Sequence, residues 1–118
     1  MTKQKSGSII NASSVAGLGG SPNVSPYIMS KHAVVGLTKA AAVEIAPHGI
    51  RVNSIHPSMM LSLETGLEVD EATMAKSIPL GRYGESDDIA SLFVFLASDE
   101  STFITGSQYQ IDDGRAAL

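Results

Sequence analysis

Apolar residues fall into three short runs that predict strands, near residues 8–13, 50–56 and 108–112. Ile9 and Ile10 stand side by side in the first run, which is typical of a strand buried on both faces of a parallel sheet. The second run alternates apolar and polar positions imperfectly and still predicts a strand. Three strands in 118 residues, separated by longer segments, indicate an α/β arrangement.

A long helix is predicted between the first two strands, over residues 25–46. Ser25 offers a hydroxyl as N-cap and Pro26 suits a first helical turn, while Pro47-His48-Gly49 ends the helix. Apolar residues occupy more than one side of this helix, so we expect burial on both the sheet side and an outer side. The outer side faces either the rest of a larger domain or a partner subunit.

Strand, helix and strand together form one βαβ unit, which requires parallel strands and favours a right-handed crossover. The expected fold is therefore a partial Rossmann-like parallel sheet of about three strands with flanking helices, in one domain over residues 1–118. Ligands of such sheets collect beyond the carboxyl ends of the strands. Ser14 and His56-Pro57 fall at such ends, so the site is expected there.

Two further helices are predicted in the second half of the chain. A short helix is expected at about residues 69–77, in a methionine-rich segment that suits either core filling or an adaptable lid. After a turn at PLGRYG, Ser86 is expected to cap a helix that runs to about Ala97 and has Asp87 and Asp88 in its first turn. Its apolar residues predict the buried positions Ile89, Leu92, Phe93 and Leu96.

Composition excludes several classes of function. The net charge is −4 with no run of lysines or arginines, so neither nucleic acid nor an anionic membrane surface is an expected partner. The absence of cysteine excludes disulfides and thiolate chemistry, and the three histidines show no metal-ligand spacing, so no metal site is predicted. No apolar run approaches the roughly 20 residues of a membrane span, and no signal peptide is recognised, so a cytoplasmic protein is expected.

Candidate chemistry lies between residues 11 and 31. Tyr27 and Lys31 are four residues apart and share one face of the long helix. A cation beside a phenol stabilises the phenolate, which makes a tyrosine usable as proton donor and acceptor. The hydroxyl of Ser14, delivered from the preceding strand, can hydrogen-bond the same substrate oxygen. Such a triplet arises often by chance, so its significance depends on the surrounding sequence.

That surrounding sequence reads GSIINASS, then a glycine-rich loop, then Y-x-x-x-S-K, with Ser14 thirteen positions before Tyr27. It resembles the short-chain dehydrogenase/reductase superfamily, whose hallmark is a Ser…Tyr-x-x-x-Lys constellation at this spacing. GIRVNSIHP, PLGRYGESDDIA and FLASDESTFITGSQYQIDDG continue the resemblance along the chain. It implies an oxidoreductase that transfers hydride between NAD or NADP and a secondary alcohol or ketone, and it also implies a homo-oligomer.

The resemblance also implies roles for individual residues. Tyr27 would be the acid/base, Lys31 would lower the pKa of Tyr27 and hold the nicotinamide ribose, and Ser14 would orient the substrate oxygen. Pro57 and Ser58 stand where the family carries a Pro-Gly pair beside the cofactor. Asn11 would be structural.

The sequence departs from the family pattern in three respects. The resemblance covers the C-terminal half of a typical member, so the family's dinucleotide-binding glycine loop and acidic ribose-binding residue have no counterpart in this sequence. Ser58 replaces a glycine, and Ser62 is at best a shifted substitute for the hydroxyl that grips the carboxamide. The final Asp-Gly-Gly reads Asp113-Gly114-Arg115. An isolated chain is therefore expected to be impaired or inactive.

Two alternatives to an active dehydrogenase follow. A non-catalytic oligomeric or binding remnant of the same fold is the main one, and the long small-residue helix is its expected interface. A hydrolase with Ser14 as nucleophile is weaker, because the sequence has no Gly-x-Ser-x-Gly turn and no convincing base.

Overall fold

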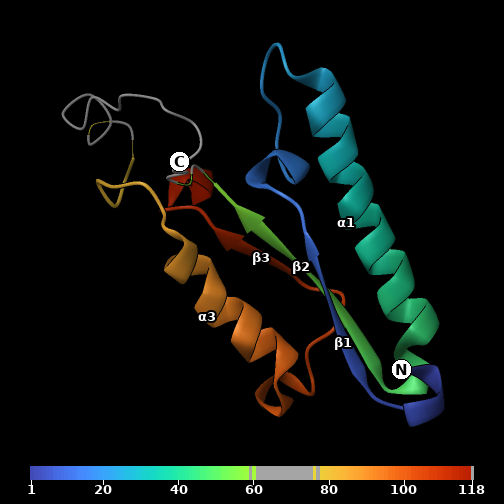
Figure 1. Ribbon diagram of the computed structural model, residues 1–118. Helices are drawn as coiled ribbons and strands as arrows, with labels where there is room; N and C mark the ends of the chain where they lie inside the picture. The colour runs from blue at the N-terminus through green and yellow to red at the C-terminus, as the bar shows by residue number, and fades with distance from the viewer. Residues whose placement is uncertain (59, 61–75, 77, 118) are drawn as a thin grey trace.

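The computed structural model describes residues 1–58, 60, 76 and 78–117, which form three strands flanked by two α-helices (Figure 1). The strands are β1 (Gly7–Ala12), β2 (Ile50–Pro57) and β3 (Gln108–Ile111), and the helices are α1 (Ser25–Ile45) and α3 (Ser86–Ala97). Short 3₁₀ turns are η1 (Thr2–Gln4), η2 (Val15–Gly17), η3 (Ala46–His48), η4 (Asp99–Ser101) and η5 (Arg115–Ala117). The predicted α/β class with a parallel three-stranded sheet is confirmed.

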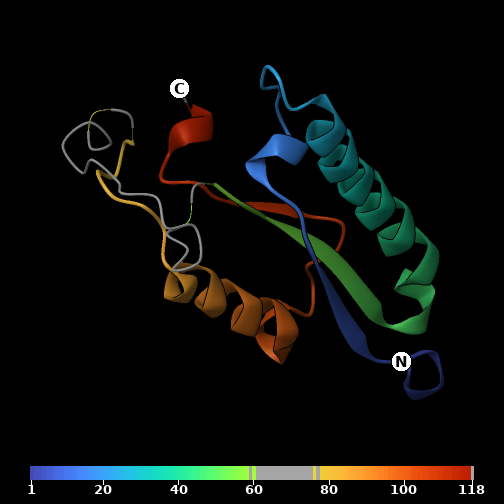
Figure 2. The same ribbon diagram turned by 45° about the horizontal axis from the view of Figure 1, so that its top comes forward.

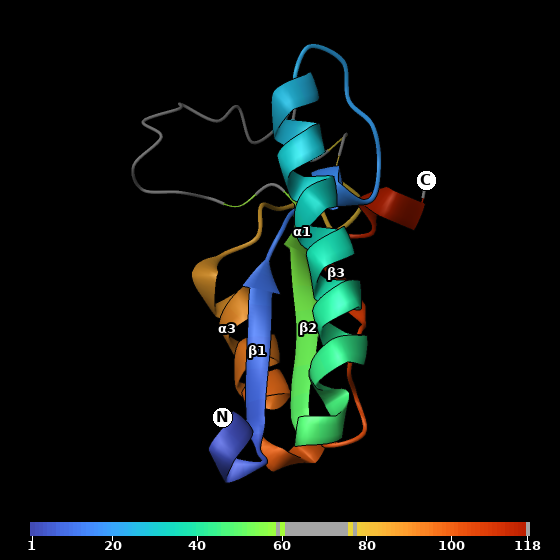
Figure 3. The ribbon, with the colours of Figure 1, turned by 90° about the vertical axis from the view of Figure 1, so that its right-hand side faces the viewer.

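The sheet has the order β1-β2-β3 and is parallel throughout, with Ile9 opposite Val52 and Ser54 opposite Gln108. Helices α1 and α3 lie on opposite faces of the sheet (Figure 2). With α1 toward the viewer and the strands pointing up, β2 lies to the right of β1, which is the predicted right-handed crossover (Figure 3). Because the chain steps in the same direction from β2 to β3 while α3 covers the other face, the second crossover has the uncommon left hand.

Strand β2 forms the centre of the core, and its residues 52–56 are all buried. Its polar side chains are satisfied: Asn53 donates to the Ile104 carbonyl (3.0 Å) and accepts from the Ser107 amide (3.0 Å). Strand β1 is only half-buried, which corrects the prediction of burial on both faces. Within the described residues β1 pairs with β2 on one side and has no strand on the other, so its outer side remains partly accessible.

Helix α1 has nearly the predicted bounds, and its buried residues Val35, Thr38 and Ala42 form one stripe toward the sheet. Thr38 links the helix to β1, because its hydroxyl accepts a hydrogen bond from the side-chain amide (Nδ2) of Asn11 at 3.0 Å. The N-cap residue is Val24 rather than the predicted Ser25, and no side chain caps this end. At the other end Gly49 has the left-handed φ of 69° that closes the turn after the helix.

Helix α3 also has the predicted bounds, with one correction at its start. Glu85, not Ser86, is the N-cap, and it forms a capping box with Asp88, whose carboxylate accepts from the Glu85 amide at 2.8 Å. Leu96 is buried, whereas Ile89, Leu92 and Phe93 are half-buried. The short helix predicted at 69–77 lies outside the described residues. None of the helices described is both long enough and apolar enough to cross a bilayer.

Candidate functional site

Ser14 lies just beyond the carboxyl end of β1, where the chain leaves the sheet and enters η2. It is half-buried, in extended conformation (φ −163°), and its hydroxyl caps η2 by accepting from the Ala16 amide at 3.1 Å. Because a 3₁₀ turn starts at the next residue, the position of Ser14 is fixed from its carboxyl side. The sequence prediction that Ser14 stands at a strand end is confirmed.

Three successive residues of β2 hold Ser13 and Ser14 from the other side. The Ser13 amide donates to the Ile55 carbonyl at 2.9 Å. The ring of His56 bonds the Ser14 carbonyl through Nδ1 at 2.7 Å. The Ser14 hydroxyl donates a long hydrogen bond of 3.5 Å to the Pro57 carbonyl. Backbone and side chain of this short segment are therefore both tied to the carboxyl end of the central strand.

The turn that carries Ser14 also packs directly on the turn of α1 that carries Lys31. The Ser13 hydroxyl donates to the Lys31 carbonyl at 3.0 Å. Gly17 lies so close that a Cβ at this position would stand 2.7 Å from the Lys31 carbonyl oxygen and 2.6 Å from the Ser13 hydroxyl. A side chain larger than hydrogen does not fit between η2 and α1. The structure thus brings the Ser14 segment against the Lys31 turn of the helix.

Tyr27 and Lys31 lie one turn apart on α1, as predicted. The Lys31 ammonium stands over the Tyr27 ring at 5.5 Å from its centroid, within the range of a cation–π contact. Tyr27 is 49% exposed. In the part of the chain that the structure describes, the Ser14 hydroxyl is directed to Pro57 and Ala16 rather than to Tyr27 or Lys31.

A cavity of about 280 Å³ lies beside η2, between the glycine-rich loop and the C-terminal turn. Its lining residues come from both segments: Val15, Leu18, Gly19, Gln110, Arg115 and Ala116. The lining is partly apolar. It includes Arg115, which stands in place of the last glycine of the Asp-Gly-Gly sequence in the family pattern. Leu18 and Gly19 of the glycine-rich loop form one wall of this cavity.

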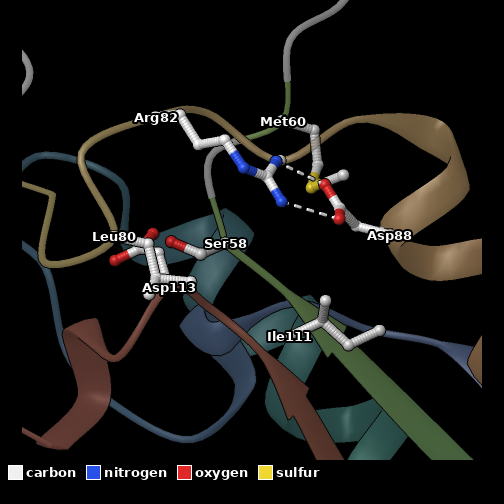
Figure 4. Close-up of a pocket in the computed structure, with 8 residues that line it drawn as sticks. Ser58, Met60, Leu80, Arg82, Asp88, Ile111 and Asp113 are labelled. Atoms are coloured by element: carbon white, nitrogen blue, oxygen red, sulfur yellow. Dashed lines mark hydrogen bonds and ion pairs between the residues drawn. The ribbon is translucent and has the colours of Figure 1, made fainter.

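A second cavity, of about 160 Å³, lies at the carboxyl ends of β2 and β3 (Figure 4). It is lined by Ser58, Met60, Leu80, Arg82, Gly84, Asp88, Ile111 and Asp113. The Ser58 hydroxyl and one carboxylate oxygen of Asp113 are buried and have no hydrogen-bond partner in the described structure. Buried polar atoms are normally paired, so these two atoms are available to a ligand that carries a donor and an acceptor.

The rim of the second cavity carries an ion pair between Arg82 and Asp88. The guanidinium donates two hydrogen bonds to the carboxylate, at 2.7 and 2.9 Å, and Figure 4 shows this paired geometry. These hydrogen bonds, together with the one from the Glu85 amide, hold the pKa of Asp88 well below its usual range. Since Asp88 also caps α3, the ion pair links the preceding turn to the start of that helix.

His56 is the titratable group most deeply buried in this region, with no exposed surface. Its second ring nitrogen, Nε2, lies 2.8 Å from the hydroxyl of Ser54, which is also fully buried. Burial lowers the pKa of His56, and the hydrogen bond to the Ser14 carbonyl opposes that effect in part. These contacts give His56 a structural role at the end of β2.

The residues present fit one part of a nicotinamide dinucleotide and not another. The unpartnered Ser58 hydroxyl, next to Pro57, suits an amide group such as the nicotinamide carboxamide. A pyrophosphate normally binds a glycine-rich turn that leads directly into a helix N-terminus. Gly19 and Gly20 are separated from α1 by residues 21–24, and the helix start has no side-chain cap. Among the described residues, no cluster of His, Asp or Glu has the arrangement of a metal site.

Sequence reasoning missed two residues that build this site, Ser13 and Gly17. Ser13 is buried and bonds both β2 and α1, whereas Gly17 permits the close approach of η2 to the helix. The available signals were the Ser13-Ser14 doublet and a glycine three residues after Ser14. Neither signal says which distant residue it faces, so the contact with Lys31 could not be read from the sequence.

The chain is similar in sequence to known oxidoreductases. Residues 1–116 match the family model described as Enoyl-(Acyl carrier protein) reductase. The chain is 49% identical over 108 residues to a cyclohexanol dehydrogenase of Acinetobacter sp. (strain SE19), covering 90% of this chain and 42% of that protein. It is 46% identical over 115 residues to a trans-4-hydroxycyclohexanecarboxylate dehydrogenase of Sinomonas cyclohexanicum, covering 98% and 43% respectively. The chain spans less than half the length of these relatives.

Solved structures show the same fold. One described as ElxO with NADP bound matches with a TM-score of 0.90 and 37% identity, over 100% of this chain and 50% of that chain. A gluconate 5-dehydrogenase homologue from Beutenbergia cavernae, also with bound NADP, matches with a TM-score of 0.90 and 37% identity, over 100% and 49%. Each of these neighbours is about twice as long as the chain matched to it.

Proposed function

The chain belongs to the short-chain dehydrogenase/reductase superfamily, and from that membership we propose that it serves NAD(P)-dependent hydride transfer between a nicotinamide cofactor and a secondary alcohol or ketone. The observation that carries this proposal is the packing of the Ser14 segment on the Lys31 turn of α1. The hydrogen bond from Ser13 to the Lys31 carbonyl and the tight fit of Gly17 hold these elements together. Preorganisation of this kind is what proton transfer to a substrate oxygen requires.

In the proposed reaction Tyr27 exchanges a proton with the substrate oxygen, and the Ser14 hydroxyl hydrogen-bonds the same oxygen. In the oxidation direction the alcohol proton goes to Tyr27, while the carbon-bound hydrogen leaves with its electron pair. The bound dinucleotide supplies the acceptor for that hydride. Lys31, whose ammonium stands over the Tyr27 ring, is proposed to bind the ribose. Pro57 and Ser58 are proposed to contact the nicotinamide end.

For the substrate we propose a cyclic secondary alcohol or its ketone. The two curated relatives named above are described as dehydrogenases of cyclohexanol and of a hydroxycyclohexanecarboxylate. The cavity beside η2 supports this class, since Val15, Leu18 and Ala116 give it apolar walls next to the Ser14 turn. An apolar ring with one reacting oxygen suits such a lining.

In the relatives, the remaining contacts to the cofactor are proposed to come from the part of their sequence that this chain does not match. Relatives and neighbours are about twice as long, and the residues described here fit the nicotinamide end rather than the pyrophosphate. Since a large share of dinucleotide affinity comes from the pyrophosphate and adenosine contacts, the chain by itself is proposed to bind NADP weakly and to turn over slowly. For residues 1–118 we propose one Rossmann-like domain.

The test is cofactor binding and turnover with matched tyrosine variants. Calorimetry with NADP(H) and NAD(H) at millimolar concentration is expected to show weak, saturable binding to the purified chain. Cyclohexanol oxidation, followed by the absorbance of reduced cofactor, is expected to fall by about 100-fold or more in Tyr27→Phe. Tyr109→Phe removes the same hydroxyl group from β3 and is expected to leave the rate unchanged. A folded chain that binds neither cofactor, or an active Tyr27→Phe variant, would contradict the proposal.

The exposed face of α1 favours a second candidate, a non-catalytic unit that assembles with a second copy of the chain. Met29, Leu37 and Val43 are strongly exposed on this helix, with Val43 at 80%, and small residues such as Ala33 and Gly36 lie among them. Apolar faces of this extent are typical of interfaces. Sedimentation of Val43→Glu is expected to show dissociation, whereas Val94→Glu, at another strongly exposed valine, this one on α3, is expected to leave the assembly intact. A wild-type monomer would exclude this candidate.

A further inference from the structure

The buried ring of His56 bridges two strands at the point where their backbone pairing stops. The ladder between β1 and β2 runs as far as the pair Ala12 and Ile55, and the Ser13 amide adds one more bond to Ile55. The next rung would need a backbone N–H from Pro57, which proline does not have. Beyond this point, the hydrogen bond between the His56 ring and the Ser14 carbonyl connects β2 to the segment that follows β1.

The partners of the ring define its protonation pattern. A carbonyl oxygen can only accept, so the 2.7 Å contact with Ser14 places a proton on Nδ1. In the neutral ring Nε2 then accepts, and the Ser54 hydroxyl at 2.8 Å donates to it. Burial, which lowers the pKa of His56, favours this neutral form. The ring is therefore fixed in one tautomer by two partners, the buried Ser54 hydroxyl on β2 and the Ser14 carbonyl just beyond β1.

We propose that His56 is a positioning residue for Ser14: its Nδ1–H holds the Ser14 peptide and thereby sets where the Ser14 hydroxyl stands. This inference rests on the proposed function, in which Ser14 orients the substrate oxygen. The Ser14 hydroxyl has only a long bond of 3.5 Å to Pro57 and the bond from Ala16, so its direction depends on the backbone that carries it. A shift of that peptide would move the Ser14 hydroxyl relative to the Lys31 turn of α1, on which this segment packs.

The first test reads the hydrogen bond itself and does not depend on activity. Nitrogen-15 spectra of the wild-type imidazole are expected to show the Nδ1–H tautomer, and the Ser14 carbonyl carbon, observed through the Val15 amide, reports the bond. Asparagine places an amide nitrogen where Nδ1 stands, and glutamine places one near Nε2. We expect His56→Asn to keep the Ser14 carbonyl shift near its wild-type value and His56→Gln to move it upfield. His32→Asn, at an exposed position on α1, is the control.

The second test separates positioning from general stability by kinetics with NADP and cyclohexanol. His56→Gln is expected to lower kcat by about ten- to a hundredfold with little change in KM for NADP, and His56→Asn to recover most of it. An Nε2–H tautomer in the wild type, an unmoved Ser14 carbonyl in His56→Gln, or equal kcat in both folded variants would overturn the inference. A wild-type chain without turnover contradicts the proposed function alone, because the tautomer and the carbonyl shift still decide the role of His56.

Discussion

Two regions flank the carboxyl end of β2, one on the side of β1 and one on the side of β3. They differ in how many of their buried polar groups have hydrogen-bond partners. On the β1 side, Ser13 and Ser14 are held by hydrogen bonds to β2 and α1, and Gly17 closes the contact without space for a methyl group. On the β3 side, Ser58 and Asp113 border a cavity with buried oxygen atoms that have no partner in the described structure. Both regions lie at the edge where parallel sheets bind ligands.

The difference indicates a division of tasks between the two regions. Polar groups that are fully paired within the protein keep one geometry, which suits residues that must orient a reacting oxygen. A buried hydroxyl or carboxylate without a partner costs free energy, and a ligand that pairs with it recovers that free energy. The β1 side is therefore preorganised, and the β3 side is completed by what binds there.

The largest loss of stability is expected from Gly17→Ala, because this substitution disrupts the close contact between η2 and α1 on the β1 side. A Cβ would overlap the Lys31 carbonyl and the Ser13 hydroxyl, so η2 or α1 must shift, at a cost of about 1–3 kcal/mol. Gly19→Ala is the matched control, because a Cβ there meets nothing within 4 Å, and its effect is expected to be neutral or slightly stabilising. Urea denaturation measures both. Equal stability of the two variants would show that the contact with Lys31 is not tight.

An intermediate effect on stability is expected when a serine on each side, Ser13 on the β1 side and Ser58 on the β3 side, is replaced by alanine. Ser13→Ala removes a hydrogen bond to the Lys31 carbonyl and should cost about 1 kcal/mol of unfolding free energy. Ser58→Ala removes a hydroxyl without a partner and should be neutral or stabilising in the absence of ligand. Thermal denaturation with and without NADP then sharpens the comparison, since Ser58→Ala should lose part of any stabilisation by the cofactor. Equal losses of stability in both unliganded variants would contradict a difference between the β1 and β3 sides in how their polar groups are paired.

The smallest effect is a loss of stability on mild acidification. His56 has a pKa below its usual value in the folded chain, so the unfolded chain binds the proton first and stability falls as the pH drops below about 6.5. Between about pH 7.5 and pH 6 one such group accounts for roughly 0.8 kcal/mol at most. Urea denaturation of the wild type and of His56→Asn at several pH values measures this. The slope should be smaller in the variant, and an unchanged slope would assign the acid sensitivity to other groups.

Local patterns were sufficient to predict most of the fold. The strand near 50–56 and the long helix start and end within one or two residues of the predicted positions, because turn residues such as Pro47 and Gly49 mark their ends. Caps were less predictable: Val24 and Glu85 stand where Ser25 and Ser86 were expected. The cap depends on the dihedral angles of the preceding loop, and a hydroxyl near the helix start does not determine them.

The candidate site was only partly predictable, for a different reason. Residue spacing identified Ser14, Tyr27 and Lys31 as candidates, and the structure shows the Ser14 segment against the Lys31 turn. The contacts that hold Ser14 come from residues such as His56, which lies 42 positions further along the chain. No local pattern encodes such a pairing, because it depends on strand register and on where Pro57 stops the ladder. The half-burial of β1 likewise follows from its edge position, which the composition of the strand does not reveal.

The opposite hands of the two crossovers have a consequence for the order of folding. Strand twist guides β1, α1 and β2 into a right-handed unit, whereas nothing in local twist directs α3 to the opposite face. The segment that follows α3 is held to β2 by side-chain bonds: Arg51 to Ser101 (2.9 Å) and to the Ser98 carbonyl (3.1 Å), and Asn53 to the Ile104 carbonyl (3.0 Å). These contacts span about fifty residues and form only on an existing strand. The segment from α3 to β3 should therefore dock last, and its amides should exchange hydrogen faster than those of β2.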